Sequence, residues 1–180
     1  MESNTEELKY PVGKYKAPGS FTPELIKEWI STLKALPAWM DACIENLDEQ
    51  QMEVPYREGG WNIRQVVHHV ADSHMNAYIR VRLLLTEDNP TIKPYMESAW
   101  AELPDVASVP VNVSVTLLHA LHRRLVALLQ ALPPDAWTRT YYHPEHKREF
   151  PLWEVVAMYA WHSRHHTEHI RRLRERMNWS

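Results

Sequence analysis

Eleven histidines stand out in this chain of 180 residues, and four of them fall in one short stretch, WHSRHHTEH, near its C-terminal end. His162 and His166 are four residues apart, and so are His165 and His169. In an α-helix, residues four apart lie on the same face with a rise of about 6 Å. Two imidazoles placed in this way can bind one metal ion, with Zn–N distances of about 2.0–2.1 Å. The stretch therefore predicts a metal-binding helix that offers two competing pairs.

The apolar residues of this segment separate the two pairs. His162 and His166 continue a stripe that begins at Leu152 and Val155 and leads on to Ile170, whereas the other pair leads into a row of arginines. We therefore expect the first pair to face inward and the second pair to face outward. Buried imidazoles need a polar partner, and a metal ion is a suitable one. The inward pair is the better candidate.

Two short motifs in the same stretch are typical of zinc peptidases, but neither is complete. The residues HHTEH match the H-x-x-E-H pattern of inverted zinc proteases. Only eleven residues follow His169, which leaves no room for a further ligand downstream. The inward pair lies in HSRHH, which lacks the glutamate that serves as general base in H-E-x-x-H proteases. The sequence therefore argues against a peptidase.

A metal site needs at least a third protein ligand, and a second histidine-rich stretch, VHHVADSH, supplies candidates. His69 lies on the inward edge of its expected helix, while His68 lies on a more polar side, four residues before Asp72. His74 shares a line with apolar residues and is a second possibility. Asp72, Ser73 and His74 are also close enough along the helix to orient His69 through hydrogen bonds. The spacing leaves His69 and His74 both open as the third ligand.

Four segments with apolar residues at helical spacing must position these side chains. Prolines and capping residues bound the segments: Thr22 and Asn62 are expected N-caps, and Pro23 suits a first helical position. Pro37 lies inside the first segment and is expected to kink or interrupt it. The expected helices cover 23–47, 63–86, 114–132 and 152–177.

The connection between the second and third helices, 86–113, is unusually long for a compact domain and carries four prolines. Such connections are usually functional, so Lys93, Tyr95 and Trp100 are candidates for the wall or lid of a site. No stretch shows sustained period-two alternation, so no sheet is expected. We predict an all-α four-helix bundle in a single domain, 1–180, with the first 20 or so residues as an extended arm.

Composition excludes several classes of function. Twenty Lys and Arg against 23 Asp and Glu give a net charge of −3, which is a poor footprint for a nucleic-acid binder. No apolar stretch approaches the roughly 20 residues that span a bilayer, and the N-terminus does not read as a secretory signal. The single cysteine, Cys43, excludes an intrachain disulfide framework and fits a reducing cytoplasm.

Five stretches together resemble the YfiT-like branch of the DinB superfamily: GGWNIRQVVHHVADSHMNAYIR, TEDNPTIKPY, WAELPD, YYHPEH and YAWHSRHHTEHI. The resemblance extends from about Tyr10 to Arg176. It implies a four-helix bundle that holds one divalent metal ion, zinc or nickel, through three histidines. The family's motif falls on His69, His162 and His166 of this chain.

Members of the family that are similar to this chain are described as metal-dependent hydrolases, cytoplasmic and homodimeric. More distant relatives transfer low-molecular-weight thiols, such as bacillithiol or mycothiol, to electrophiles. The resemblance therefore implies a small-molecule substrate, possible use of such a thiol, and a homodimer. It implies neither a nucleic-acid partner nor a membrane.

Three neutral imidazoles would leave at least one coordination position open, as in a catalytic site. The ion could lower the pKa of a bound water to about 7, or deprotonate a bound thiol. We therefore expect a hydrolase, with thiol S-transfer as the close alternative and a non-catalytic metal-binding bundle as the third. No general base is identified. Among the other histidines, His119 and His122 are expected to be solvated or hydrogen-bonded. His143 and His146 lie in a polar loop that could approach a site or another subunit, and a surface position is the preferred expectation.

Overall fold

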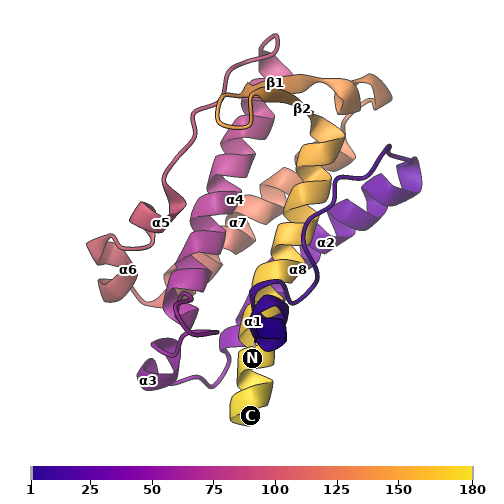
Figure 1. Ribbon diagram of the computed structural model, residues 1–180. Coiled ribbons are helices and arrows are strands. Elements are labelled where there is room, and N and C mark those ends of the chain that lie inside the picture. Colours follow the sequence, from indigo (N-terminus) through magenta and orange to yellow (C-terminus); the bar gives the residue numbers. More distant parts are fainter. Residues whose placement is uncertain (1, 180) are drawn as a thin grey trace.

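The computed structural model of the chain describes residues 2–179 and confirms the predicted four-helix bundle (Figure 1). The four long helices are α2 (Pro23–Ile44), α4 (Ile63–Thr86), α7 (Val111–Gln130) and α8 (Leu152–Met177). The shorter elements are α1 (Glu2–Lys9), α3 (Glu49–Met52), α5 (Glu97–Trp100), α6 (Pro104–Ser108), the 3-10 helix η1 (Pro134–Thr138), and the strands β1 (Thr140–His143) and β2 (Arg148–Pro151). None of the helices in this part of the chain combines the length and the apolar character that a membrane span requires.

Local capping explains where the long helices begin. The Thr22 hydroxyl accepts the Leu25 N–H at 3.3 Å, as an N-cap does. Asn62 and Gln65 form a reciprocal capping box at the start of α4. The predicted bounds of α4 and α8 are confirmed, whereas α2 ends at Ile44 instead of 47 and α7 begins at Val111 instead of 114.

Of the two outcomes expected at Pro37, a kink or an interruption, the interruption is wrong, because α2 continues through it. Proline removes the N–H that would bond to the carbonyl four residues earlier, which here belongs to Leu33. That carbonyl is not left without a partner, since it accepts a hydrogen bond from the His122 ring at 2.6 Å. A side chain of α7 thus replaces the backbone donor that Pro37 lacks.

Each long helix packs mainly on two others: α2 and α4 both contact α7 and α8, so they lie diagonally across the bundle. The long connection runs back along α4, because Arg80 donates to the Lys93 carbonyl, Gln65 to the Ala101 carbonyl and His68 to the Val109 carbonyl. As a result α7 begins beside the start of α4. The connection thus covers one side of α4, and it includes α5 and α6 (Figure 1).

The prediction that the chain contains no sheet is wrong. Strands β1 and β2 form an antiparallel hairpin in which Tyr141 pairs with Phe150. Each strand has four residues, which is too short for an alternating pattern to stand out in the sequence. The hairpin is tied to the long connection, since the Ile92 N–H donates to the Tyr142 carbonyl at 3.1 Å. It closes one end of the bundle beside the start of α8 (Figure 1).

The N-terminal segment differs from the extended arm that we expected. Residues 2–9 form the helix α1, and the chain then continues without helix to residue 22. α1 lies beside the C-terminal half of α8, and the chain after it runs along α8 toward its N-terminal end, where Phe21 stacks on Trp153 (Figure 1). The carbonyl of Lys9 accepts a hydrogen bond from His169, and that of Pro11 accepts one from Arg172. The arm therefore covers a face of α8 that would otherwise be open to solvent.

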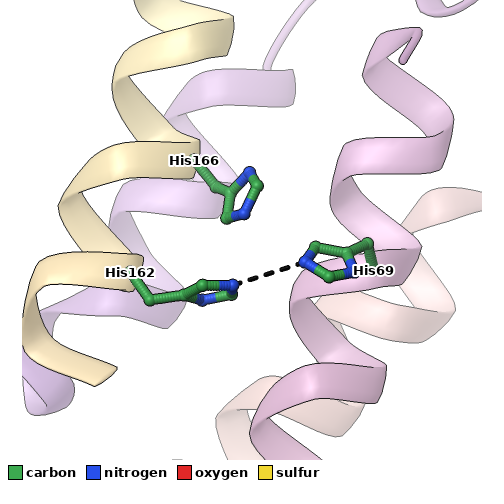
Figure 2. Close-up of side chains that lie close together, drawn as sticks. All are labelled: His69, His162 and His166. Carbon is green, nitrogen blue, oxygen red and sulfur yellow. Dashed lines mark hydrogen bonds between the residues drawn. The ribbon is translucent and has the colours of Figure 1, made fainter. Parts of the chain in front are cut away.

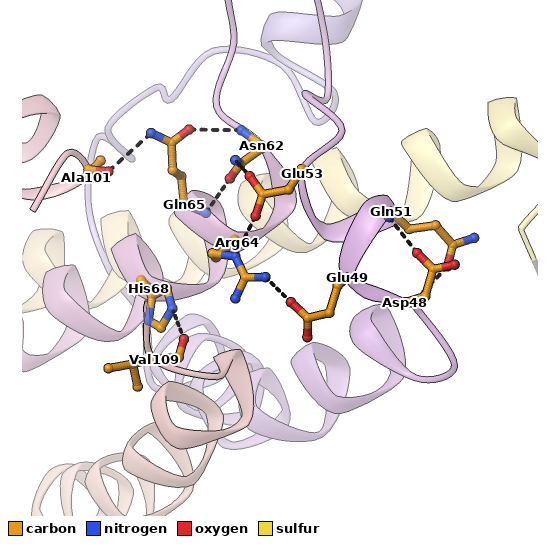
Figure 3. A network of polar contacts seen from close by, with 10 residues as sticks. All are labelled: Asp48, Glu49, Gln51, Glu53, Asn62, Arg64, Gln65, His68, Ala101 and Val109. Atoms are coloured by element: carbon orange, nitrogen blue, oxygen red, sulfur yellow. Dashed lines mark hydrogen bonds and ion pairs between the residues drawn. The ribbon is translucent and has the colours of Figure 1, made fainter. Parts of the chain in front are cut away.

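A polar network fixes the N-terminal end of α4 (Figure 3). Arg64, on α4, forms ion pairs with Glu53 at 2.8 Å and with Glu49. His68 was expected on a polar side but is buried, where its Nε2 donates to the Val109 carbonyl at 3.2 Å and its Nδ1 bonds to Ser114 at 2.8 Å. Since both ring nitrogens are used, His68 acts as a structural tie between α4 and α7.

The apolar core of the bundle consists of two clusters. One contains Leu33, Val81 and Tyr159, and the other contains Leu36, Val66 and other residues toward the opposite end of the bundle. On α8 the first cluster stops at Ala160 and the second begins at Ile170. The stretch of α8 between them carries the four clustered histidines predicted to do chemistry.

Candidate metal centre

His69, His162 and His166 converge across the bundle, the first from α4 and the other two from α8 (Figure 2). We call these three residues the central trio. One potential ligand atom from each lies within 4.8 Å of the others. The Nε2 atoms of His69 and His162 are 3.3 Å apart. Two nitrogens bound tetrahedrally to one ion at 2.0–2.1 Å would be separated by about 3.3 Å, so the geometry of this pair fits a shared metal ion.

The central trio is uncharged at neutral pH. Burial lowers the pKa of His69 to about 4, and it lowers the pKa values of His162 and His166 well below 6.5. Neighbouring imidazoles act in the same direction. Neutral imidazole is the form that binds metals, because its unprotonated nitrogen supplies the lone pair. The fold therefore keeps these rings in the state that a metal requires.

A second group of histidines, His165, His166 and His169, also has ligand atoms within 4.8 Å of one another. All three come from α8, and His166 belongs to both groups. We had expected His165 and His169 to face outward, and this is wrong: only 8% of His165 and 2% of His169 is exposed. The residues that cover them lie far away in the sequence, so the face of α8 could not be judged from its own pattern.

The covering groups explain the burial of His165 and His169 without a metal. The His165 ring stacks on Trp161 at a centroid distance of 4.4 Å, and the His169 ring stacks on Tyr56 at 3.9 Å. The Nε2–H of His169 donates to the Lys9 carbonyl at 3.2 Å. Their Nδ1 atoms, like that of His166, are buried and have no hydrogen-bond partner among the residues described.

A chain of hydrogen bonds leads from the central trio into the core. The Nδ1 of His162 lies 3.2 Å from the Nε2 of His74, and the Nδ1 of His74 lies 3.0 Å from the Nε2 of His122. The Nδ1 of His122 lies 2.6 Å from the Leu33 carbonyl, the one freed by Pro37. We call His74 and His122 the relay pair.

The Leu33 carbonyl determines which ring nitrogen carries the proton in each histidine of this hydrogen-bond chain. A carbonyl can only accept, so His122 must carry its proton on Nδ1, and as a neutral ring it accepts at Nε2. His74 then donates from Nδ1 and accepts at Nε2, so His162 must donate from Nδ1. This arrangement leaves the Nε2 of His162 unprotonated and directed at His69. Such fixing of the ring that binds a metal is typical of metal sites.

These hydrogen bonds correct what we expected of His74 and of its neighbours Asp72 and Ser73. His74 was an alternative third ligand, or a residue that orients His69, but it bonds instead to His162 and His122 and is fully buried. Asp72 and Ser73 form no hydrogen bond with His69 among the contacts described. His122 is buried and hydrogen-bonded, whereas His119 is exposed and lies 2.6 Å from Asp41.

A cavity of about 190 Å³ borders the central trio through His162. The long connection contributes Tyr95 to its wall, as predicted, while Lys93 and Trp100 are not among the lining residues. The hairpin contributes His143 and His146, and only 8% of His143 is exposed, so the expected surface position was wrong for this residue. The full lining consists of Ser73, Arg80, Pro94, Tyr95, Glu97, Tyr141, His143, Glu145, His146, Phe150, Met158, Tyr159, Trp161 and His162.

The structure also reveals a carboxylate that the sequence did not single out. Glu97, the first residue of α5, places an Oε2 atom 4.0 Å from the Nε2 of His69, and its side chain is 62% exposed. Glu97 also lines the cavity beside His162. The long connection brings it there, so only the path of that connection could have identified it.

A larger cavity, about 720 Å³, lies between α2 and α8, away from the central trio. It contains Cys43, and burial raises the pKa of this thiol to about 11. Its lining arginines include Arg164 and Arg171, which form ion pairs with glutamates. This cavity has neither a reactive thiolate nor a histidine, so the small cavity is the better candidate for chemistry.

Known proteins place the chain in a family. The model of the DinB superfamily matches residues 24–170. Proteins of Bacillus mycoides and Bacillus cereus, each named "putative metal-dependent hydrolase", are 51% identical over 174 residues and 50% identical over 173 residues. These alignments cover 97% and 96% of this chain, respectively, and 99% of each relative.

A solved structure agrees with the assignment. YfiT from Bacillus subtilis, described as "a probable metal-dependent hydrolase with an unusual four-helix bundle topology", superimposes with a TM-score of 0.94 at 45% identity. The match covers 97% of this chain and 99% of YfiT. The chain therefore belongs to the DinB superfamily.

Proposed function

We propose that this protein is a metal-dependent hydrolase whose ion is bound by His69, His162 and His166. The observation that carries the proposal is the 3.3 Å approach of two neutral imidazole nitrogens from different helices, next to a cavity. In the metal-free protein, the Nε2–H of His69 can donate to the unprotonated Nε2 of His162, and a bound ion would take the place of that proton. The names of the relatives at about 50% identity support a hydrolase.

When bound, a divalent ion lowers the pKa of a coordinated water to about 7 and so supplies a nucleophile at neutral pH. The chain's own groups would do the rest. The Glu97 carboxylate lies 4.0 Å from the Nε2 of His69, so a proton released beside the site would reach it through one bridging water. The relay pair holds His162 in the tautomer that presents Nε2. The half-buried Tyr95 and the buried Tyr159 form part of the cavity wall.

Zinc or nickel is the ion that we propose, since imidazole suits both metals. Three protein ligands leave room for water and substrate, as in catalytic zinc sites. We further propose a small-molecule substrate, a cytoplasmic location and a homodimer, on the strength of the family resemblance. Light scattering of the purified protein tests the homodimer, which predicts twice the chain mass of 21.2 kDa.

Thiol S-transfer is the alternative that uses the same open position. The protein's own thiol does not serve, because Cys43 is buried and its pKa is raised to about 11. A low-molecular-weight thiol would have to enter as a second substrate. A non-catalytic metal-binding bundle, the third candidate, predicts an ion with no exchangeable water.

One experiment separates these candidates. The metal-loaded protein is given a panel of small esters, amides and electrophiles, with and without a low-molecular-weight thiol, and products are identified by mass spectrometry. A hydrolase forms products that contain added water and needs no thiol. Products that appear only with the thiol and contain it would establish the transferase. If neither appears and no water exchanges on the ion, the protein is a metal binder.

A further inference from the structure

Two arginines of α4 are buried to the same degree but have different surroundings. Arg64 is 6% exposed and Arg80 is 8% exposed. Arg64 is neutralised by Glu49 and Glu53 (Figure 3). Arg80 forms no ion pair with any carboxylate within residues 6–179, whose side chains the structure describes. A buried charge without a partner is costly, so the surroundings of Arg80 need an explanation.

The donors of Arg80 are only partly used. Its Nη2 donates to the Lys93 carbonyl at 3.1 Å, which ties the long connection to α4. Its Nε is buried and has no partner. The guanidinium carbon lies 5.8 Å from the centre of the Tyr95 ring. The Tyr159 hydroxyl is a further hydrogen-bond partner of Arg80. These contacts hold the side chain in place, but none of these partners carries a negative charge.

This charge faces the cavity beside the central trio. Arg80 lines that cavity together with Tyr95, Tyr141 and Tyr159, whose hydroxyls can donate hydrogen bonds. Tyr159 lies between the two groups: its side chain hydrogen-bonds with Arg80, and its ring lies 5.8 Å from the His162 ring. Arg80 and His162 line the same cavity. The carboxylates that line the cavity are Glu97 and Glu145, and both are largely exposed.

We infer that this cavity binds the oxyanion of a small substrate, a carboxylate or phosphate group, through Arg80. The inference rests on the proposed function, since it specifies the substrate of the same site. An arginine offers several donors in a planar fork that matches such groups. A volume of about 190 Å³ is below that of pockets for drug-sized ligands, so the substrate is small. The oxyanion would lie at Arg80, and the bond to be hydrolysed toward His162.

The test measures binding of inorganic phosphate and of acetate to the full-length protein by calorimetry, at constant ionic strength and with metal removed. The variants are Arg80→Gln and Arg80→Lys, and the matched control is Arg82→Gln, an exposed arginine of the same helix. Thermal unfolding verifies that each variant is folded. Wild type and Arg82→Gln should bind at least one of the anions. Arg80→Gln should weaken binding at least about tenfold, and Arg80→Lys should fall between them.

Equal binding by wild type and Arg80→Gln, or no binding of either anion by the wild type, would overturn the inference. If Arg80→Gln does not fold, Arg80→Lys decides: an affinity unchanged from wild type contradicts a role for the forked donors. The relative affinities for phosphate and acetate identify which group the site prefers.

The same samples separate this inference from the proposed function. His162→Ala should lose the metal and keep Arg80-dependent binding of the anion. If wild type binds the anion but no metal, the hydrolase proposal fails and the anion site at Arg80 stands. If wild type binds metal but the Arg80 variants bind phosphate and acetate as wild type does, only the inference about the anion site fails.

Discussion

His162 and His166 of the central trio and the pair His165 and His169 lie on adjacent faces of α8, yet their nitrogens meet different partners. The central trio directs nitrogens from two helices toward one point beside a cavity. The pair stacks on Trp161 and Tyr56 and bonds to a backbone carbonyl. Burial and spacing alone therefore do not identify a ligand. The convergence of ring nitrogens from separate helices beside a cavity is the better criterion.

The largest effect that we expect distinguishes these two groups directly. His166 belongs to both, so its replacement cannot tell them apart, but His162 and His165 belong to one each. His162→Ala should abolish stoichiometric metal binding, because it removes one of three ligands. His165→Ala should keep about one ion per chain. The measurement is metal content of the folded protein after dialysis.

Retention of the ion by His162→Ala together with its loss in His165→Ala would reverse the assignment and place the metal under the N-terminal arm. Circular dichroism of each variant provides the control for folding.

The next largest effect is a loss of stability in acid for the metal-free protein. Burial lowers the pKa values of His69 and His122 to about 4, and that of His169 to about 3, from 6.5. Above pH 6.5 these rings are neutral in both states and contribute no pH dependence. As the pH falls from about 6.5 toward 4, the unfolded chain takes up the protons first. Each ring shifted to about 4 then destabilises the fold by up to about 3 kcal/mol.

Urea unfolding at pH 7, 6 and 5 measures this dependence. The free energy of unfolding of His122→Gln should depend less steeply on pH, because one histidine with a lowered pKa is removed. A free energy of unfolding that stays constant from pH 7 to pH 5 would contradict the lowered pKa values.

A smaller effect should follow from breaking the relay pair. His122→Leu leaves His74 without an acceptor and the Leu33 carbonyl without its donor, which should cost about 1–3 kcal/mol of stability. Because the tautomer of His162 is then no longer fixed, metal affinity should fall about 10- to 100-fold. His122→Gln keeps one donor and one acceptor and should restore most of the affinity.

Nitrogen-15 NMR of the metal-free protein reports the tautomer of His162 independently of stability. Wild type should show a protonated Nδ1, and His122→Leu a mixture. A protonated Nε2 in the wild type would show that the relay does not set the tautomer.

The smallest effect concerns a histidine outside both groups. His119 is exposed and lies 2.6 Å from Asp41 on the surface between α7 and α2. Exposed pairs of this kind contribute little, so His119→Ala should change the free energy of unfolding by less than about 1 kcal/mol and leave metal binding unchanged. A loss of metal in this variant would indicate a site that lies outside the bundle interior.

Local signals in the sequence were sufficient to predict the long helices, because capping residues and prolines act within a few residues of a helix end. The bounds of α8 and the N-caps Thr22 and Asn62 follow from such signals. The inward direction of His166 also followed from the apolar stripe. The choice of His69 depended on the resemblance, since the spacing alone left His74 equally possible.

The remaining features depend on contacts between distant parts of the chain, which no local pattern encodes. His169 is buried because Lys9 lies over it, 160 residues earlier. Glu97 and Arg80 come together only because the long connection runs back along α4. Pro37 is tolerated because His122, on another helix, donates a hydrogen bond to the Leu33 carbonyl that the proline leaves without a backbone donor.

The most direct test of the metal assignment is a crystal structure of the metal-loaded protein, with diffraction data collected at the absorption edge of the bound ion. We expect one anomalous peak per chain about 2.0–2.1 Å from a nitrogen of each of His69, His162 and His166. A peak between His165, His166 and His169, or no peak in a protein that contains its ion by elemental analysis, would contradict the central claim.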